Sequence, residues 1–203
     1  MQTMSPDVLT TLQWIFVLAA AVILHEYAHG WVALKLGDPT AKLLGRLTLN
    51  PLKHVDPIGT ILVPIITKIT LGFPFGWAKP VPVNFANLRH PKRDMIFVAA
   101  AGPAVNIVLA LIASFLFPFG PKIFGLAVVI NLMLAIFNML PIPPLDGSRI
   151  LAGLLPNHLA RQYMYLEPFG FIIVIILLQI NALDFLGSFV LSIAKVLIGS
   201  FAL

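Results

Sequence analysis

The chain has 203 residues, of which 59% are hydrophobic and only 10% are charged. Soluble globular domains carry about 25% charged residues, so this composition excludes an ordinary soluble domain and indicates one integral membrane domain over residues 1–203. The net charge is +5, but the basic residues lie at the ends of apolar runs. That placement is typical of orientation in a lipid bilayer, and we expect no nucleic-acid partner. Because cysteine is absent, a metal site must use His, Asp or Glu.

The first predicted element is an apolar helix over residues 5–36 that carries a polar pentapeptide at 25–29, His-Glu-x-x-His. Helical residues four apart lie on the same face, so His25 and His29 can hold one metal ion between them. Glu26 is turned partly aside, where it can reach a water on that metal. Idle ionisable groups are costly in a membrane, which favours a functional site. The alternative is a pair of hydrogen-bonded histidines inside a helical bundle.

A polar connection and a short apolar segment follow the first helix. Alternating apolar residues at 43–49 predict a short strand or hairpin. Asp56-Pro57 starts a helix that ends near Gly72, and its length of about 15 residues is short for a crossing, which favours a re-entrant segment. Residues 72–84 alternate prolines with apolar residues and predict a short β-like loop. Such irregular backbone is tolerated in a membrane only where protein or a watery cavity covers it.

The rest of the chain contains four more apolar segments, so we expect an all-α polytopic membrane protein. The first of them contains the small-residue patch Ala99-Ala100-Ala101-Gly102-Pro103, which allows close helix contact and a kink. Together with the first helix these segments predict about five transmembrane helices, besides the re-entrant segment and the β-like loop. Their predicted ranges are 90–117, 121–140, 168–180 and 184–201.

A catalytic zinc ion needs three protein ligands and an open water position. Asp146 is the favoured third ligand, because it follows a proline-stiffened turn at a helix end. The alternative for Asp146 is simple turn chemistry, since Asp-Gly favours turns on its own. The other candidates are predicted to be solvated or to start a helix; they are His54, His90 and His158, and Glu167.

Basic residues cluster in three segments, 42–53, 89–93 and 149–161. The positive-inside rule places all three in the cytoplasm, provided that residues 57–72 dip into the membrane and return. The N-terminus is then outside and the C-terminus inside. The first helix and the span before Asp146 both descend to the cytoplasm, so the metal motif and Asp146 lie toward that side.

Two motifs far apart in the chain are His25-Glu26-x-x-His29 and Asn138-x-x-Pro141-x-x-x-x-Asp146-Gly147, and two supporting motifs are Gly102-Pro103-x-x-Asn106 and residues 76–84. Together they resemble the site-2 protease family of intramembrane zinc metalloproteases, in its compact bacterial-type branch. The resemblance implies that His25, His29 and Asp146 bind Zn²⁺. It also implies that Glu26 is the general base and that Asn138 positions substrate or stabilises the oxyanion.

The resemblance implies hydrolysis of peptide bonds in or near transmembrane segments of membrane protein substrates. The expected location is a bacterial or archaeal cell membrane, with the active site toward the cytoplasm. A substrate helix must unwind before cleavage, and residues 72–84 offer it a strand partner. The predicted substrate-binding residues are Asn138, Pro80, Pro82 and Asn84.

Several alternatives stay open. Residues 72–84 fit a plain membrane-buried connector equally well. The polar motif also fits a transporter or ion-binding protein, although the chain lacks repeated halves. Two further alternatives are a different membrane zinc protease that uses Glu167 as a ligand and a catalytically silent scaffold of the same family.

Overall fold

A computed structural model describes residues 8–72, 74 and 76–199. All the regular structure in these residues is helical, which confirms the all-α prediction. A π-helical segment, Pro57–Leu62, leads into α3, and several short 3-10 turns lie between the longer helices. The α-helices are α1 Val8–Lys35, α2 Thr40–Leu43, α3 Val63–Leu71, α4 Pro91–Leu116, α5 Pro121–Asn138, α6 Asp146–Leu154, α7 Asn157–Met164, α8 Gly170–Gln179 and α9 Asp184–Ile198.

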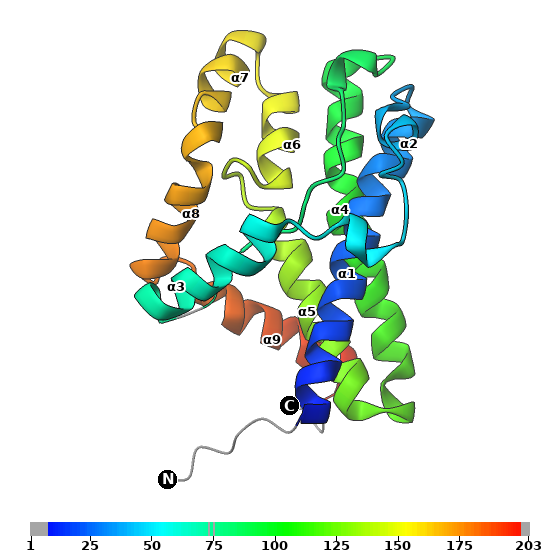
Figure 1. Cartoon of the computed structure of the whole chain (residues 1–203), viewed down its shortest axis with the longest axis vertical. Coiled ribbons are helices and arrows are strands. Elements are labelled where there is room, and N and C mark those ends of the chain that lie inside the picture. Colours follow the sequence, from blue (N-terminus) through cyan, green and yellow to red (C-terminus); the bar gives the residue numbers. More distant parts are fainter. Residues whose placement is uncertain (1–7, 73, 75, 200–203) are drawn as a thin grey trace.

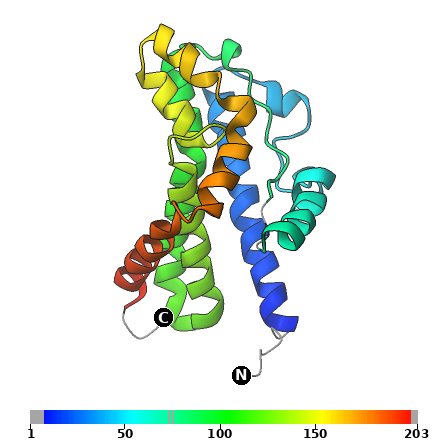
Figure 2. The ribbon, with the colours of Figure 1, turned by 90° about the vertical axis from the view of Figure 1, so that its left-hand side faces the viewer.

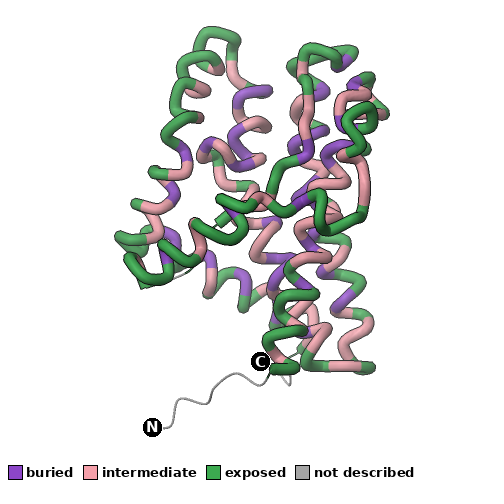
Figure 3. Tube along the Cα trace, in the orientation of Figure 1, coloured by how far each residue is buried: buried purple, intermediate pink, exposed green. Residues whose placement is uncertain are grey.

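Helices α1, α4 and α5 form a bundle along the length of the molecule, as Figures 1 and 2 show. Small and β-branched residues line their contacts, so the helices approach closely. Val17 and Ala21 of α1 pack against Ile130 of α5. Figure 3 shows buried residues along the inner faces of the helices and exposed residues around the outside. Many of the exposed residues are large and apolar, as expected where lipid covers the surface.

Among the described residues, four helical ranges are long and apolar enough to cross a membrane. The predicted count of about five includes α9 as a separate span, but α9 has only 15 residues. Figure 2 shows α9 following α8 toward the end of the molecule where α1 begins, whereas Figure 1 shows that the chain turns between the two helices. The number of crossings therefore stays a prediction. The four ranges are Val8–Lys35, Pro91–Phe119, Pro121–Asn138 and Asn157–Gln179.

The predicted helix boundaries agree with local capping. The Asp56 side chain accepts a hydrogen bond from the Ile58 N–H at the start of the π-helical segment, as an N-cap residue does. Gly72 ends α3 with a left-handed φ of 86°. Prolines begin α4 and α5, where their fixed φ suits the first turn. The predicted start of the first helix at Ser5-Pro6-Asp7 lies outside the described residues.

The predicted strand or hairpin at residues 43–49 is wrong. Leu43 ends the short helix α2, and Gly45 then turns the chain with a left-handed φ of 63°. Leu43, Leu44 and Leu49 are exposed and only Leu47 is half-buried, so their pattern does not mark one buried face of a strand. Residues 76–84 are an extended loop without strand pairing, and Trp77 stacks on Phe171 of α8 at 4.5 Å between ring centroids.

Candidate metal centre

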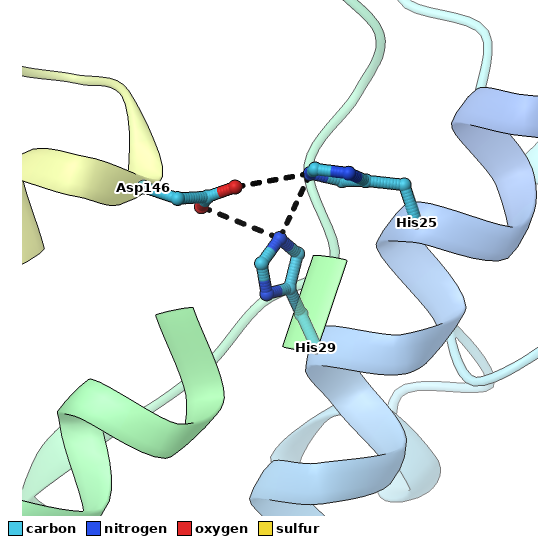
Figure 4. Close-up of side chains that lie close together, drawn as sticks. All are labelled: His25, His29 and Asp146. Atoms are coloured by element: carbon cyan, nitrogen blue, oxygen red, sulfur yellow. Dashed lines mark hydrogen bonds and ion pairs between the residues drawn. The ribbon is translucent and has the colours of Figure 1, made fainter. Parts of the chain in front are cut away.

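The structure brings the three predicted metal ligands together. His25 and His29 come from one face of α1, and Asp146 begins α6 (Figure 4). The two histidine Nε2 atoms are 3.0 Å apart. Asp146 reaches both of them, with Oδ2 at 3.1 Å from His25 Nε2 and Oδ1 at 3.3 Å from His29 Nε2. In the part of the chain that the structure describes, these three residues form the one cluster with metal-ligand geometry.

Each imidazole is held in place by a hydrogen bond at Nδ1, the ring nitrogen that faces away from Asp146. His29 Nδ1 lies 2.7 Å from the carbonyl oxygen of Val98 on α4. A carbonyl only accepts, so Nδ1 carries the proton and Nε2 presents a lone pair toward Asp146. His25 Nδ1 lies 2.6 Å from the side-chain oxygen of Asn106, also on α4. Metal-binding histidines are usually held by such a hydrogen bond on the far nitrogen.

The donor set fits zinc. Asp146 Oδ2 is buried and has no hydrogen-bond donor among the described residues. Zinc with ligands at about 2.0–2.1 Å in a tetrahedron separates its ligand atoms by roughly 3.3 Å, close to the distances between these three side chains. Three lone-pair donors that converge without a proton donor among them are stabilised by a cation.

Two glycines permit this convergence. A Cβ on Gly102 of α4 would lie within 3.0 Å of the Nε2 atoms of both histidines, so only glycine leaves the space between them open. The prediction that the small-residue patch allows close helix contact is therefore confirmed. A Cβ on Gly147 would clash with the backbone carbonyl of Met139 after α5. Gly147 thus lets α6 begin directly against the end of α5, where Asp146 faces α1.

Glu26 lies beside the ligand cluster and not within it. Its carboxylate oxygen Oε2 accepts a hydrogen bond of 2.7 Å from the backbone N–H of Val81. This agrees with the expectation that Glu26 turns partly aside from the shared face of the histidines. The bond also joins α1 to the loop of residues 76–84, a contact that the sequence did not reveal.

The comparisons with known proteins agree with this geometry. The model of Peptidase family M50 matches residues 120–178. The protein named "Putative zinc metalloprotease YwhC" from Bacillus subtilis strain 168 is 40% identical over 192 residues, covering 87% of this chain and 83% of that protein. The chain belongs to peptidase family M50. The predicted relationship to site-2 proteases is thereby confirmed.

Other relatives extend the M50 similarity beyond one genus. "Putative zinc metalloprotease Rip2" from Mycolicibacterium smegmatis is 34% identical over 188 residues, or 84% of this chain and 70% of that protein. "Zinc metalloprotease MJ0392" from Methanocaldococcus jannaschii is 30% identical over 157 residues, or 74% of this chain and 35% of that protein. No solved structure matches this one.

The predicted substrate-binding residues of this M50 member lie at the end of α5 and in the loop of residues 76–84, which Glu26 contacts through Val81. Asn138 ends α5, and its side-chain amide donates to the Leu134 carbonyl at 2.9 Å. Pro80 is exposed, Pro82 is half-buried, and the side chain of Asn84 caps the next turn by accepting from the Ala86 N–H. Their roles toward substrate stay predictions.

Asp38 anchors the loop that carries Asn84, a role that the sequence analysis did not identify. Its fully buried carboxylate accepts from the backbone N–H of Asn84 at 2.7 Å and from the side chains of Thr40 and Asn87. Burial alone raises the pKa of this carboxyl, but the hydrogen bonds from Thr40, Asn87 and Asn84 outweigh burial and hold the pKa below its ordinary value. The anchor therefore stays charged at neutral pH.

The other candidate ligands lie away from the cluster. His54 was expected to be solvated, and this is wrong: it is 4% exposed, and its Nε2 lies 2.8 Å from the Thr48 carbonyl. His90 and His158 are exposed, as expected. Glu167 forms an ion pair with Arg149, so it belongs to the α6–α8 region and not to the metal site.

The sequence analysis also missed Asn131. It lies in the middle of α5, is 4% exposed and accepts a hydrogen bond from Asn106. An asparagine inside a membrane-length apolar helix is a detectable signal, because burying an amide without partners is costly.

Proposed function

We propose that this chain is an intramembrane zinc metalloprotease that hydrolyses peptide bonds in or near transmembrane segments of other membrane proteins, as a single domain over residues 1–203. The observation that carries the proposal is the convergence of His25, His29 and Asp146 in a membrane member of family M50. A transporter is not favoured, because its relay needs no such cluster of three lone-pair donors. Zinc is the expected cofactor.

The protein residues divide the reaction among them. Bound zinc supplies a lowered water pKa of about 7 and polarises the scissile carbonyl. His25, His29 and Asp146 would hold it through the atoms that now face one another. Glu26 takes the proton of the attacking water and passes it to the leaving amine. The side-chain amide of Asn138 donates to the oxyanion that develops on the substrate.

Residues 76–84 supply the surface along which an unwound substrate lies. Val81 is joined to Glu26 through its backbone N–H, so this loop places bound substrate beside the proposed base. Arg46 holds the loop from another side by donating to the carbonyls of Lys79 and Pro80 at 3.1 and 3.2 Å. A loop fixed at both places can act as a template for strand addition, with Pro80, Pro82 and Asn84 along it.

The active site faces the cytoplasm in this proposal. The end of the molecule that carries α2, α6 and α7 also holds the three basic segments, which the positive-inside rule assigns to the cytoplasm. Helix α3 lies beside the bundle and returns its chain to the same end, as a re-entrant segment would (Figures 1 and 2). The multi-pass arrangement has five crossings if α9 crosses alone, and four if α8 and α9 share one. The relatives point to a bacterial or archaeal membrane.

Metal analysis tests the ligand assignment. Asp146→Ala should lower bound zinc from one per chain to a small fraction, because a catalytic zinc site needs three protein ligands. The matched control is His158→Ala, which removes an exposed histidine far from the cluster and should leave zinc unchanged. The measurement is zinc per purified chain after dialysis against a weak chelator. Full zinc retention in Asp146→Ala would rule out the assignment.

Cysteine labelling tests the orientation, because the natural sequence has no cysteine. Ala86→Cys should react with a membrane-impermeant reagent only after the cytoplasmic face is opened. Phe119→Cys, at the opposite end of the bundle and 82% exposed, should react in intact cells. Labelling of Ala86→Cys in intact cells, with Phe119→Cys protected until the cytoplasmic face is opened, would mean that residues 57–72 cross the membrane, which contradicts the re-entrant arrangement.

A further inference from the structure

We propose that Asn131 is a positioning residue for the metal site: acting through Asn106, it fixes which nitrogen of His25 carries the proton. The proposal rests on the proposed function, because it concerns how tightly the same site holds zinc. The observation behind it is an unbroken series of hydrogen bonds from the backbone of α5 to a ring nitrogen of His25.

The series crosses three helices. On α5, the Asn131 side-chain NH₂ donates to the Ala127 carbonyl at 2.9 Å. On α4, the Asn106 side-chain NH₂ donates to Asn131 Oδ1 at 2.8 Å and also lies 3.3 Å from the Ala21 carbonyl. Asn106 Oδ1 lies 2.6 Å from His25 Nδ1 on α1. Both asparagines are buried, and Asn106 is completely so, which excludes water as a substitute partner.

Each bond in the series determines the direction of the next. The Ala127 carbonyl only accepts, so Asn131 must turn its NH₂ toward it and its oxygen toward Asn106. That oxygen only accepts as well, so Asn106 must present its NH₂ to Asn131 and its own oxygen to His25. His25 Nδ1 must then carry the proton, which leaves the lone pair on Nε2, the atom that faces Asp146.

His29 shows why His25 needs this support. His29 Nδ1 contacts the Val98 carbonyl directly, and a backbone carbonyl cannot exchange its acceptor for a donor. His25 instead contacts an amide group, which presents a donor after rotation by 180°. If Asn106 turned its NH₂ toward His25, Nδ1 would accept that hydrogen bond and the imidazole proton would lie on Nε2. Nε2 could then no longer bind a metal. Asn131 opposes that rotation, because its oxygen is the closer of the two acceptors for the Asn106 NH₂, at 2.8 Å compared with 3.3 Å for the Ala21 carbonyl.

Two substitutions at the same position separate this role from simple packing. Asn131→Leu keeps a branched side chain of similar reach but removes the closer acceptor for the Asn106 NH₂ and leaves it only the Ala21 carbonyl at 3.3 Å. Asn131→Asp keeps the acceptor but loses the donor to Ala127 and places an acidic group in an apolar helix, which destabilises the fold. Val128→Ala, on the same helix, is the packing control, since Val128 is fully buried against α4 and α9 and has no part in the series.

The measurement is competition for zinc with a colorimetric chelator, beside thermal unfolding of the zinc-free forms in detergent. Asn131→Leu should lose about 10-fold in zinc affinity, at the lower end of the range for residues that orient metal ligands. The zinc affinity of Asn131→Asp should stay within about threefold of the parental affinity, although this variant should unfold at a lower temperature than Asn131→Leu. Val128→Ala should unfold earlier than the parent and keep the parent affinity.

Zinc affinity that follows thermal stability across the three variants would overturn the proposal, and so would parental affinity in Asn131→Leu. Either result would refute the positioning role of Asn131 and leave the proposed metal site standing. A parent protein that binds zinc no better than His25→Ala would instead refute the metal site and the proposed function with it. The two failures are therefore distinguished in one experiment.

Discussion

Glu26→Gln should lower cleavage of a membrane-embedded substrate by at least about 100-fold, the usual scale for a lost general base. The amide oxygen of Gln can still accept the hydrogen bond from the Val81 N–H, so the loop of residues 76–84 keeps its place. The amide cannot take a proton from water, so the loss is confined to catalysis. Zinc content should stay at the parental value, because Glu26 is outside the ligand cluster.

The matched control is Glu167→Gln, the same change at the other glutamate of the chain. Glu167 pairs with Arg149 at a partly exposed position, and such pairs contribute about 0–1 kcal/mol. Its cleavage rate should remain close to the parental rate. A gel-based cleavage assay and metal analysis on the same preparations provide both readouts. Equal rates for Glu26→Gln and the parent would refute the base assignment, and no cleavage by the parent would favour the transporter.

Gly102→Ala should abolish both zinc binding and cleavage although it adds only a methyl group. The added Cβ would lie within 3.0 Å of the Nε2 atoms of His25 and His29, in the space where the ligands converge. The change should not unfold α4 by itself, since alanine is favoured over glycine in a helix by about 1 kcal/mol. Helix content by circular dichroism should therefore match the parent, while zinc per chain falls.

Gly187→Ala provides the control for the backbone effect of replacing glycine. Gly187 lies within α9, and a Cβ there would meet nothing within 4 Å. This variant should keep parental zinc and cleavage and unfold at the same or a slightly higher temperature. Parental zinc content in Gly102→Ala would show that the space between the histidines is not where the metal lies.

The local parts of the site were predictable because they depend on the helix alone. His25 and His29 are four residues apart, so any helix places them together. Prolines at the first turns of α4 and α5 similarly marked where those helices begin. Asp146 was different: it was the best placed of the remaining candidates, but its spacing fits a metal ligand and a plain turn equally well, and the family motif decided for the ligand.

The burial pattern was not predictable, for a reason specific to membranes. Lipid and protein core are equally apolar, so an outward-facing residue and a buried one look alike in the sequence. Phe115 is 81% exposed and Val128 is fully buried, and both lie in uniformly apolar helices. A buried asparagine such as Asn131 can be suspected from the sequence, but which distant segments meet, as Glu26 meets Val81 and Asn106 meets Asn131, cannot be read from either segment alone.

The three proposed ligands come from different helices, and this has a consequence for biosynthesis. His25 and His29 lie in the first described helix, whereas Asp146 begins α6, in the last third of the chain. Ribosomes add about 5–20 residues per second, so the third ligand is synthesised on the order of ten seconds after the second. Until α4, α5 and the start of α6 are inserted, the histidines have neither Asn106, Val98 nor Asp146 as partners. A nascent chain therefore lacks the complete set of proposed ligands, and proteolytic competence can arise only after the start of α6 has been inserted.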